Sequence, residues 1–84
     1  MTIRHLTIFV AVADLGSMSA AAASLYLSQP TVSQAVRELE QHYHCLLFER
    51  LGKILYLTDQ GRLLLDKSQE VVMLFRELEE IMWN

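Results

Sequence analysis

L-S-Q-P-T-V-S-Q-A-V-R-E-L-E, residues 27–40, is the stretch that decides the fold, because it has the pattern of a well-marked helix. Ser28 is a good N-cap residue, and Pro30 fits a first helical turn, where backbone N–H groups have no partner. Beyond them, apolar residues recur at helical spacing and predict a single apolar stripe. The members of this stripe are Val32, Val36, Leu39 and Tyr43.

The other face of this helix carries short or planar hydrogen-bonding groups, which are suited to reading base edges in a major groove. Gln34 and Arg37 lie one turn apart and are the first candidates, since glutamine can pair with adenine and arginine with guanine. Arg37 could instead hold a phosphate or pair with Glu38 or Glu40. Taken alone, the segment is more simply read as an ordinary amphipathic surface helix, so the flanking sequence decides. The polar face comprises Gln29, Thr31, Ser33, Gln34 and Arg37.

The residues before this helix predict two further helices. The first spans Thr2 to Leu15, Gly16 ends it, and Ser17 can cap the next. The second, Met18 to Leu25, is rich in alanine, whose small side chain lets another helix approach closely, although high helix propensity explains the alanines equally well. Residues 26–28 then form the turn of a helix-turn-helix. The expected inward face of the first helix is Leu6, Phe9, Val10 and Ala13.

The residues after the central helix predict a hairpin and a last helix. His44 can end the central helix, because histidine tolerates a positive φ better than most non-glycine residues. Two short apolar runs, residues 47–50 and 54–57, flank Leu51-Gly52-Lys53 and indicate a two-stranded hairpin. A hairpin that follows a helix-turn-helix is a wing, whose tip can lie along a phosphate backbone. Thr58 then caps the last helix.

The last helix carries a second apolar pattern. Leu64, Val71 and Leu78 are seven residues apart, as in a coiled-coil seam, although Lys67 and Ser68 interrupt it. The alternative is packing of this helix on its own domain, but the apolar surface exceeds what one small domain needs. We therefore expect self-association through this helix. The predicted dimerisation residues are Leu64, Val71, Leu74, Phe75, Leu78, Ile81 and Met82.

Charge is unevenly distributed along the 84 residues, whose formal net charge is −3. Up to Thr58 the four basic and four acidic residues cancel, whereas the segment after it has three basic and six acidic residues. The predicted reading half is therefore neutral, and the excess negative charge belongs to the last helix. The apolar run from Leu6 to Ala13 is too short to span a bilayer, so we expect a cytoplasmic protein with no membrane contact.

Metal, cofactor and enzyme chemistry find little support in the sequence. The single cysteine excludes an internal disulfide, and the cluster of His42, His44 and Cys45 lacks the spacing of a metal site. His5 has no partner that suggests catalysis. No set of Asp, His and Ser residues points to a nucleophile with its base. We expect no metal, no cofactor and no enzymatic activity.

Five strings in this chain resemble, in order and spacing, the N-terminal DNA-binding domain of LysR-type transcriptional regulators. They are I-R-H-L-x-x-F-V-A-V-A before G-S, A-A-A-x-S-L, L-S-Q-P-T-V-S-Q-A-V-R-E-L-E, L-F-E-R and L-T-D-Q-G. The resemblance covers the chain to Gly61, and the remaining helix matches the linker helix of the family in position and character. Any one string would be weak evidence, but five in order are highly specific.

The resemblance implies a mainly α-helical, winged helix-turn-helix fold with a small two-stranded wing and a long C-terminal linker helix. It places the DNA-binding domain at residues 1–58, the helix-turn-helix at about 18–37 and the wing at about 47–57. Residues 59–84 would be the linker helix for dimerisation. Complete family members end in a two-lobed domain that binds a small-molecule inducer, so we expect this chain to be a fragment without it. DNA-binding roles carry over to Ser17, Gln29, Pro30, Thr31, Ser33, Arg37, Arg50 and Lys53.

The chain departs from the family pattern mainly by losing positive charge. Family members often carry a basic residue where this chain has Ser24, Gln34, Glu38, Leu46, Ile54 and Tyr56. Met18 replaces a common aromatic residue and His44 a common glycine. Three cations per subunit, Arg37, Arg50 and Lys53, remain for phosphate contact, and the helix N-termini at Ser17 and Ser28 add N–H donors. Fewer phosphate contacts predict weak binding with a shallow salt dependence.

Sequence-specific binding of double-stranded DNA is therefore the leading hypothesis. A symmetric dimer would read two half-sites of an interrupted palindromic operator. The alternative is a dimerisation or interaction module that keeps the same fold but binds DNA weakly, and the neutral charge of the reading half favours it.

Overall fold

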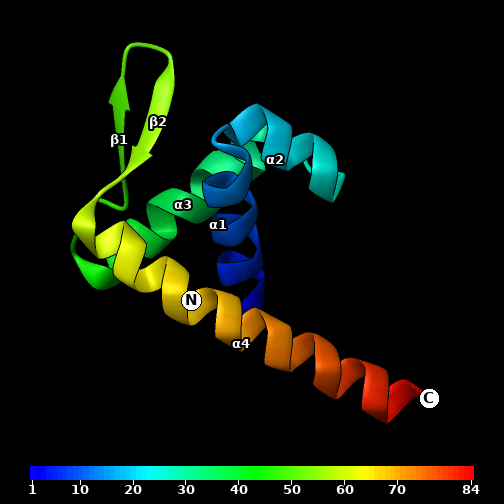
Figure 1. The fold of residues 1–84 in the computed structure, drawn as a ribbon. Coiled ribbons are helices and arrows are strands. Elements are labelled where there is room, and N and C mark those ends of the chain that lie inside the picture. Colours follow the sequence, from blue (N-terminus) through cyan, green and yellow to red (C-terminus); the bar gives the residue numbers. More distant parts are fainter.

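The computed structural model describes residues 1–84 as four helices and one two-stranded antiparallel sheet, the predicted winged helix-turn-helix (Figure 1). Helices α1, α2 and α3 pack together, the hairpin projects from one end of them, and α4 runs past α1 and away from the domain. The elements are α1 (Ile3–Leu15), α2 (Met18–Leu25), α3 (Gln29–Tyr43), β1 (Phe48–Leu51), β2 (Ile54–Leu57) and α4 (Asp59–Trp83).

Capping residues set the helix boundaries, as the sequence predicts. Gly16 ends α1 with a φ of 68°, and the Ser17 hydroxyl accepts a hydrogen bond from the Ala20 N–H at 3.1 Å. His44 ends α3 in the same left-handed conformation, with a φ of 54°. Tyr26 also adopts it at the end of α2, with a φ of 57°, and this the sequence did not indicate. Each of the first three helices thus ends at a single C-cap residue of positive φ.

The helix-turn-helix is held by a cluster of buried side chains from α1, α2 and α3. Val12 and Val32 are fully buried in it, as is the small Ala21 of α2, which packs against α3. Leu25, at the end of α2, and Leu27, in the turn, pack against the cluster. The buried members are Ile8, Val12, Ala21, Ala22, Val32, Ala35 and Val36.

A second buried cluster joins α1 and α3 to the start of the hairpin and to α4. Phe9 and Leu39 lie at its centre, both fully buried, and the Phe9 ring packs against Phe48 with ring centroids 5.4 Å apart. The buried members are Leu6, Phe9, Leu39, Leu47 and Val72.

Two sequence-based assignments of buried faces were wrong in detail. In α1 the buried residues are Leu6, Ile8, Phe9 and Val12, while Val10 and Ala13 are only half-buried. The single stripe predicted for α1 fails because this helix contacts α2, α3 and α4, so its buried arc is wider. In α3 the buried stripe ends at Leu39. Tyr43, in the last turn of the helix, is not buried and has 42% of its surface exposed. Ala35 completes the stripe instead.

The hairpin forms with a two-residue turn, Gly52-Lys53, in which Gly52 has a φ of 64°. Leu51, expected in the turn, pairs with Ile54 and belongs to β1. Leu47, expected in the strand, is instead buried in the core just before it. At the base of the hairpin Phe48 pairs with Leu57, and both pack against the core.

Helix α4 contacts its own domain over its first half only. Leu64, Leu65 and Ser68 pack toward α1, and Val72 is the last buried residue, with 4% of its surface exposed. From Met73 onward every residue of α4 is exposed. No helix is long and apolar enough to cross a membrane.

Gly61 fixes the junction between the hairpin and α4. Thr58 caps α4, since its hydroxyl oxygen accepts from the Gly61 N–H at 3.0 Å, and it also donates to the Leu46 carbonyl at 2.6 Å. The Thr58 N–H donates to the Leu47 carbonyl at 3.0 Å. A Cβ at position 61 would overlap that same Leu47 carbonyl oxygen and touch Leu57. Only glycine lets the first turn of α4 lie this close to the chain before β1.

We predict that Gly61→Ala destabilises the domain by about 2 kcal/mol or more, because backbone, which cannot rotate aside, must shift. Urea unfolding followed by circular dichroism measures the change. Gln60→Ala, at the exposed neighbouring position, serves as the control and should stay within about 0.5 kcal/mol of the unsubstituted chain. Equal stability of the two variants would show that Gly61 is not needed for the junction.

Candidate nucleic-acid interface

Helix α3 presents a polar face to solvent, opposite its buried stripe. Most of the predicted contact residues lie on it with exposed side chains, namely Gln29, Pro30, Thr31, Gln34 and Arg37. The face begins at the N-terminus of α3, directly after the turn that joins it to α2. This arrangement offers amide, hydroxyl and guanidinium groups on one protruding helix surface.

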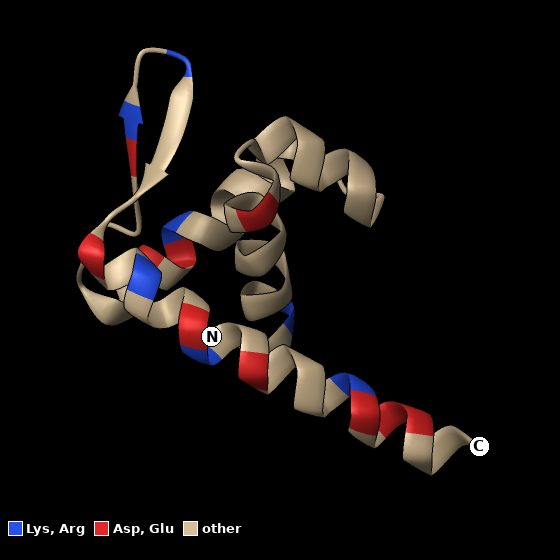
Figure 2. Cartoon of the chain, in the orientation of Figure 1, with Lys and Arg blue, Asp and Glu red and all other residues tan.

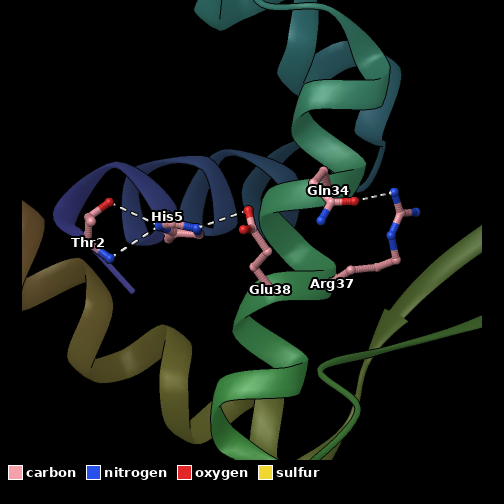
Figure 3. A network of polar contacts seen from close by, with 5 residues as sticks. All are labelled: Thr2, His5, Gln34, Arg37 and Glu38. Carbon is pink, nitrogen blue, oxygen red and sulfur yellow. Dashed lines mark hydrogen bonds and ion pairs between the residues drawn. The ribbon is translucent and has the colours of Figure 1, made fainter.

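Gln34 and Arg37 are hydrogen-bonded to each other. Arg37 Nη2 donates to Gln34 Oε1 at 2.8 Å, across one turn of the helix (Figure 3). The pairing of Arg37 with Glu38 or Glu40, which the sequence left open, is not formed. Glu38 bonds His5, and Glu40 Oε2 accepts from the Leu47 N–H at 2.8 Å. The two acids are therefore engaged elsewhere, and Arg37 turns to the neutral amide.

A chain of contacts that the sequence analysis missed connects α1 to the polar face of α3. The Thr2 N–H donates to His5 Nδ1 at 3.1 Å, so the hydrogen of this ring lies on Nε2. His5 Nε2 in turn lies 3.3 Å from Glu38 Oε1 and donates to it (Figure 3). The signal for the first bond was the spacing of Thr2 and His5, three residues apart at a helix start. The second joins residues 33 apart, which no local pattern reveals.

Three residues predicted to contact DNA through their hydroxyl groups form hydrogen bonds within the protein instead. Ser17 caps α2, and the Thr31 hydroxyl lies 2.8 Å from that of Ser28, the residue that caps α3. Ser33 is half-buried, and its hydroxyl donates to the Met18 sulfur at 3.3 Å. Ser33 thus faces α2 more than solvent, and its hydroxyl holds the two helices of the motif together.

The two predicted wing cations are exposed and form no ion pair. Arg50 stands opposite Leu55 in the hairpin, and Lys53 lies at the turn (Figure 2). The acid nearest to Arg50 in the sequence, Glu49, precedes it in the same strand, and successive strand residues point to opposite faces. Both cations are therefore free to meet an anion.

Acidic residues lie mainly along α4, away from the tip of the wing (Figure 2). Six of the ten acidic residues follow Thr58, and one of them, Glu70, pairs with Lys67 at 3.5 Å within α4. On the polar face of α3, Glu38 is the exception, a carboxylate beside Gln34 and Arg37.

Residues 3–62 match the family model described as bacterial regulatory helix-turn-helix protein, lysR family. The chain is 44% identical over 82 residues to the RuBisCO operon transcriptional regulator of Allochromatium vinosum, covering 98% of this chain and 27% of the relative. It is 36% identical over 80 residues to the HTH-type transcriptional activator CmpR of Synechocystis sp., covering 95% and 26%. The chain thus spans about a quarter of the length of these curated relatives.

Two similar solved structures are complexes with DNA. The CbnR DNA-binding domain in its DNA complex superposes with a TM-score of 0.88 and 32% identity, covering 98% of this chain and 94% of that one. The BenM DNA-binding domain bound to catB site 1 DNA superposes with a TM-score of 0.91 and 27% identity, covering 98% and 91%.

We predict that His5 and Glu38 couple α1 to α3 by about 0.5 kcal/mol, a modest value because their side chains are 20% and 49% exposed. A double-mutant cycle of His5→Ala and Glu38→Ala, measured by urea unfolding at pH 7, gives this coupling energy. The more exposed pair Lys67 and Glu70, whose side chains are 77% and 61% exposed, provides the matched cycle, where we expect a value near zero. A His5–Glu38 coupling no larger than the control would contradict the contact.

Proposed function

The chain belongs to the lysR family of bacterial regulatory helix-turn-helix proteins, and we propose that it binds double-stranded DNA sequence-specifically, as a dimer, to regulate transcription. The observation that carries the proposal is the exposed polar face of α3, with Gln34 and Arg37 at its centre. The relatives named as transcriptional regulators and the neighbouring structures titled as DNA complexes support it.

In the proposed complex α3 enters the major groove and the wing lies along the flanking phosphate backbone. Gln29, Pro30, Thr31, Gln34 and Arg37 would face the bases and the adjacent backbone. Arg50 and Lys53 would contact phosphate, because they are exposed, unpaired and carried on the projecting hairpin. Ser17 and Ser33 would act indirectly, since their hydroxyls cap α2 and tie α2 to α3.

We propose that residues 1–58 form the DNA-binding part and residues 59–84 the helix through which two chains pair. The proposed contact is the apolar side of α4. Leu64 is half-buried against its own domain, so it would contribute least. The exposed members are Val71, Leu74, Phe75, Leu78, Ile81 and Met82. Pairing there would remove from water apolar side chains that the single chain leaves exposed.

The charge distribution suggests modest affinity for DNA. Glu38 places a carboxylate on the face that would meet the duplex, and the three candidate cations offer few phosphate contacts. This favours a second candidate function, a dimerisation or interaction module of the same fold that binds DNA weakly. We favour DNA binding, because the polar residues of α3 remain exposed and a dimer doubles every contact.

The remaining assignments follow from this proposal. A DNA target in a bacterium places the protein in the cytoplasm, with an interrupted palindrome as the operator. Regulation of a promoter requires no catalysis, metal or cofactor from this chain. Any small-molecule inducer would act through residues beyond this DNA-binding part, since the relatives are about four times its length.

We predict a shallow salt dependence of DNA binding. Three cationic contacts per subunit give a slope of log K against log salt of about −5 for a dimer, at about 0.9 per contact. The slope is measured by fluorescence titration, at several salt concentrations, of a DNA duplex from the promoter region upstream of the gene that encodes this chain. A slope of about −8 or steeper would contradict this contact set.

Lys53→Ala should reduce the steepness of this slope by about 1 per subunit, because it removes a phosphate contact. Arg76→Ala, which removes one charge from α4, should leave the slope unchanged. Equal slopes for Lys53→Ala and the unsubstituted chain would show that the wing does not contact phosphate through Lys53. Absence of binding even at low salt would favour the interaction-module alternative.

We predict that Leu78→Asp converts the dimer to a monomer, because it buries a carboxylate without a partner in the apolar interface. Met73→Asp is the matched control, since Met73 and Leu78 are both 54% exposed but lie on different sides of α4. Sedimentation equilibrium should show a monomer for Leu78→Asp and a dimer for Met73→Asp. A dimer for both variants would exclude this face of α4 as the contact.

A further inference from the structure

A hollow lies between α1 and the first half of α3, beside the residues proposed to face the bases. Its volume is about 350 Å³, and Glu38 lines it together with Thr31 and Gln34. Glu38 and Gln34 are four residues apart, so their side chains lie one turn apart on the same side of α3. The Glu38 carboxylate is therefore continuous with the proposed reading face. The lining residues are Arg4, His5 and Ile8 of α1 and Pro30, Thr31, Gln34, Ala35 and Glu38 of α3.

His5 holds one oxygen of this carboxylate and leaves the other free. The Thr2 N–H donates to His5 Nδ1 at 3.1 Å, and His5 Nε2 lies 3.3 Å from Glu38 Oε1 (Figure 3). The two oxygens of a carboxylate together offer about four acceptor sites. Glu38 Oε2 forms no hydrogen bond within the chain, and 49% of the Glu38 side chain is exposed. The contact with α1 thus orients Glu38 and leaves it able to accept from a partner.

Neither of the arginines near Glu38 forms an ion pair with it. Arg37 donates to Gln34 Oε1 and points away from the Glu38 carboxylate (Figure 3). Arg4 lines the same hollow but is not paired with Glu38. A bound duplex would therefore meet an acceptor whose negative charge no arginine offsets directly.

An acceptor that has no donor discriminates among the bases of a major groove. Cytosine presents its N4 amino group there, whereas guanine presents the acceptors O6 and N7, and thymine presents O4 and a methyl group. An ionised carboxylate accepts from an amino group and is repelled by acceptor atoms. Adenine also has an amino group, N6, but carries the acceptor N7 beside it. Cytosine is therefore the base that suits Glu38 best.

We propose that Glu38 is a specificity-determining residue, which accepts a hydrogen bond from cytosine N4, and that His5 is the residue of α1 that positions it. The inference rests on the proposed DNA binding and adds one base preference to it. It also gives the carboxylate on α3 a role. The same charge that weakens binding to DNA in general excludes guanine and thymine from one position.

The test is selection of bound duplexes from a random library, followed by sequencing, for the 84-residue chain and three variants. Glu38→Ala removes the acceptor, and His5→Ala removes only the group that orients it. Glu77→Ala removes one negative charge from the exposed surface of α4 and is the matched control for the change of net charge. Two duplexes that differ only at the identified base pair, cytosine in one and guanine in the other, are then titrated by fluorescence.

We expect the unsubstituted chain and Glu77→Ala to prefer cytosine over guanine by about tenfold at one position, as one good base contact provides. Glu38→Ala should lose the preference at that position alone. It should also bind the guanine duplex more tightly than the unsubstituted chain does, because the repulsion is gone, and a merely destabilised variant cannot gain affinity in this way. His5→Ala should weaken the preference at the same position and leave the other positions unchanged.

A gain in affinity by Glu38→Ala that is equal for all sequences would place Glu38 against phosphate and overturn the inference. A preference of the unsubstituted chain for any base other than cytosine, at the position where Glu38→Ala relaxes it, would do the same. A cytosine preference that His5→Ala leaves unchanged would overturn the positioning role of His5. In each of these cases the proposed function stands. Recovery of no common motif by the unsubstituted chain would instead overturn sequence-specific binding itself, and this inference with it.

Discussion

Burial of one face of α3 is the constraint on which the rest of the structure depends. Val32 and Val36 lie in the cluster shared with α1 and α2, and Leu39 lies in the cluster shared with α1 and α4, all with almost no exposed surface. Because residues of a helix repeat every 3.6 positions, this burial turns Gln34 and Arg37 outward. The core that stabilises the domain therefore also decides which side chains meet a partner. A slip of one residue in this packing would rotate the reading face by about 100°.

The sequence predicted those features that depend on neighbouring residues. Ser17, Ser28 and Thr58 cap helices, Gly52 makes the turn of the hairpin, and His44 takes the left-handed position, all from local chemistry. The same local patterns predicted the exposed polar face of α3. Its base contacts and the pairing of two chains through α4 remain predictions.

Contacts between elements were harder to predict from the sequence, because they depend on how the helices are oriented in space. The buried position of Ile8 follows from three helices around α1, and the exposure of Tyr43 follows from the point at which its neighbours end. The His5–Glu38 contact joins two helices and has no local signature. The choice of Gln34 by Arg37 follows from the engagement of both nearby acids, of which one bonds α1 and the other the chain before β1.

The junction at Gly61 also sets a distance that lies outside any one chain. Thr58 is tied to the carbonyls of both Leu46 and Leu47, and Gly61 lies against the latter, so α4 leaves the domain in one direction. If two chains pair along α4, this direction determines how far apart their two α3 helices stand. In such a pair, the junction would set the number of base pairs that separate the two half-sites, independently of which bases α3 contacts.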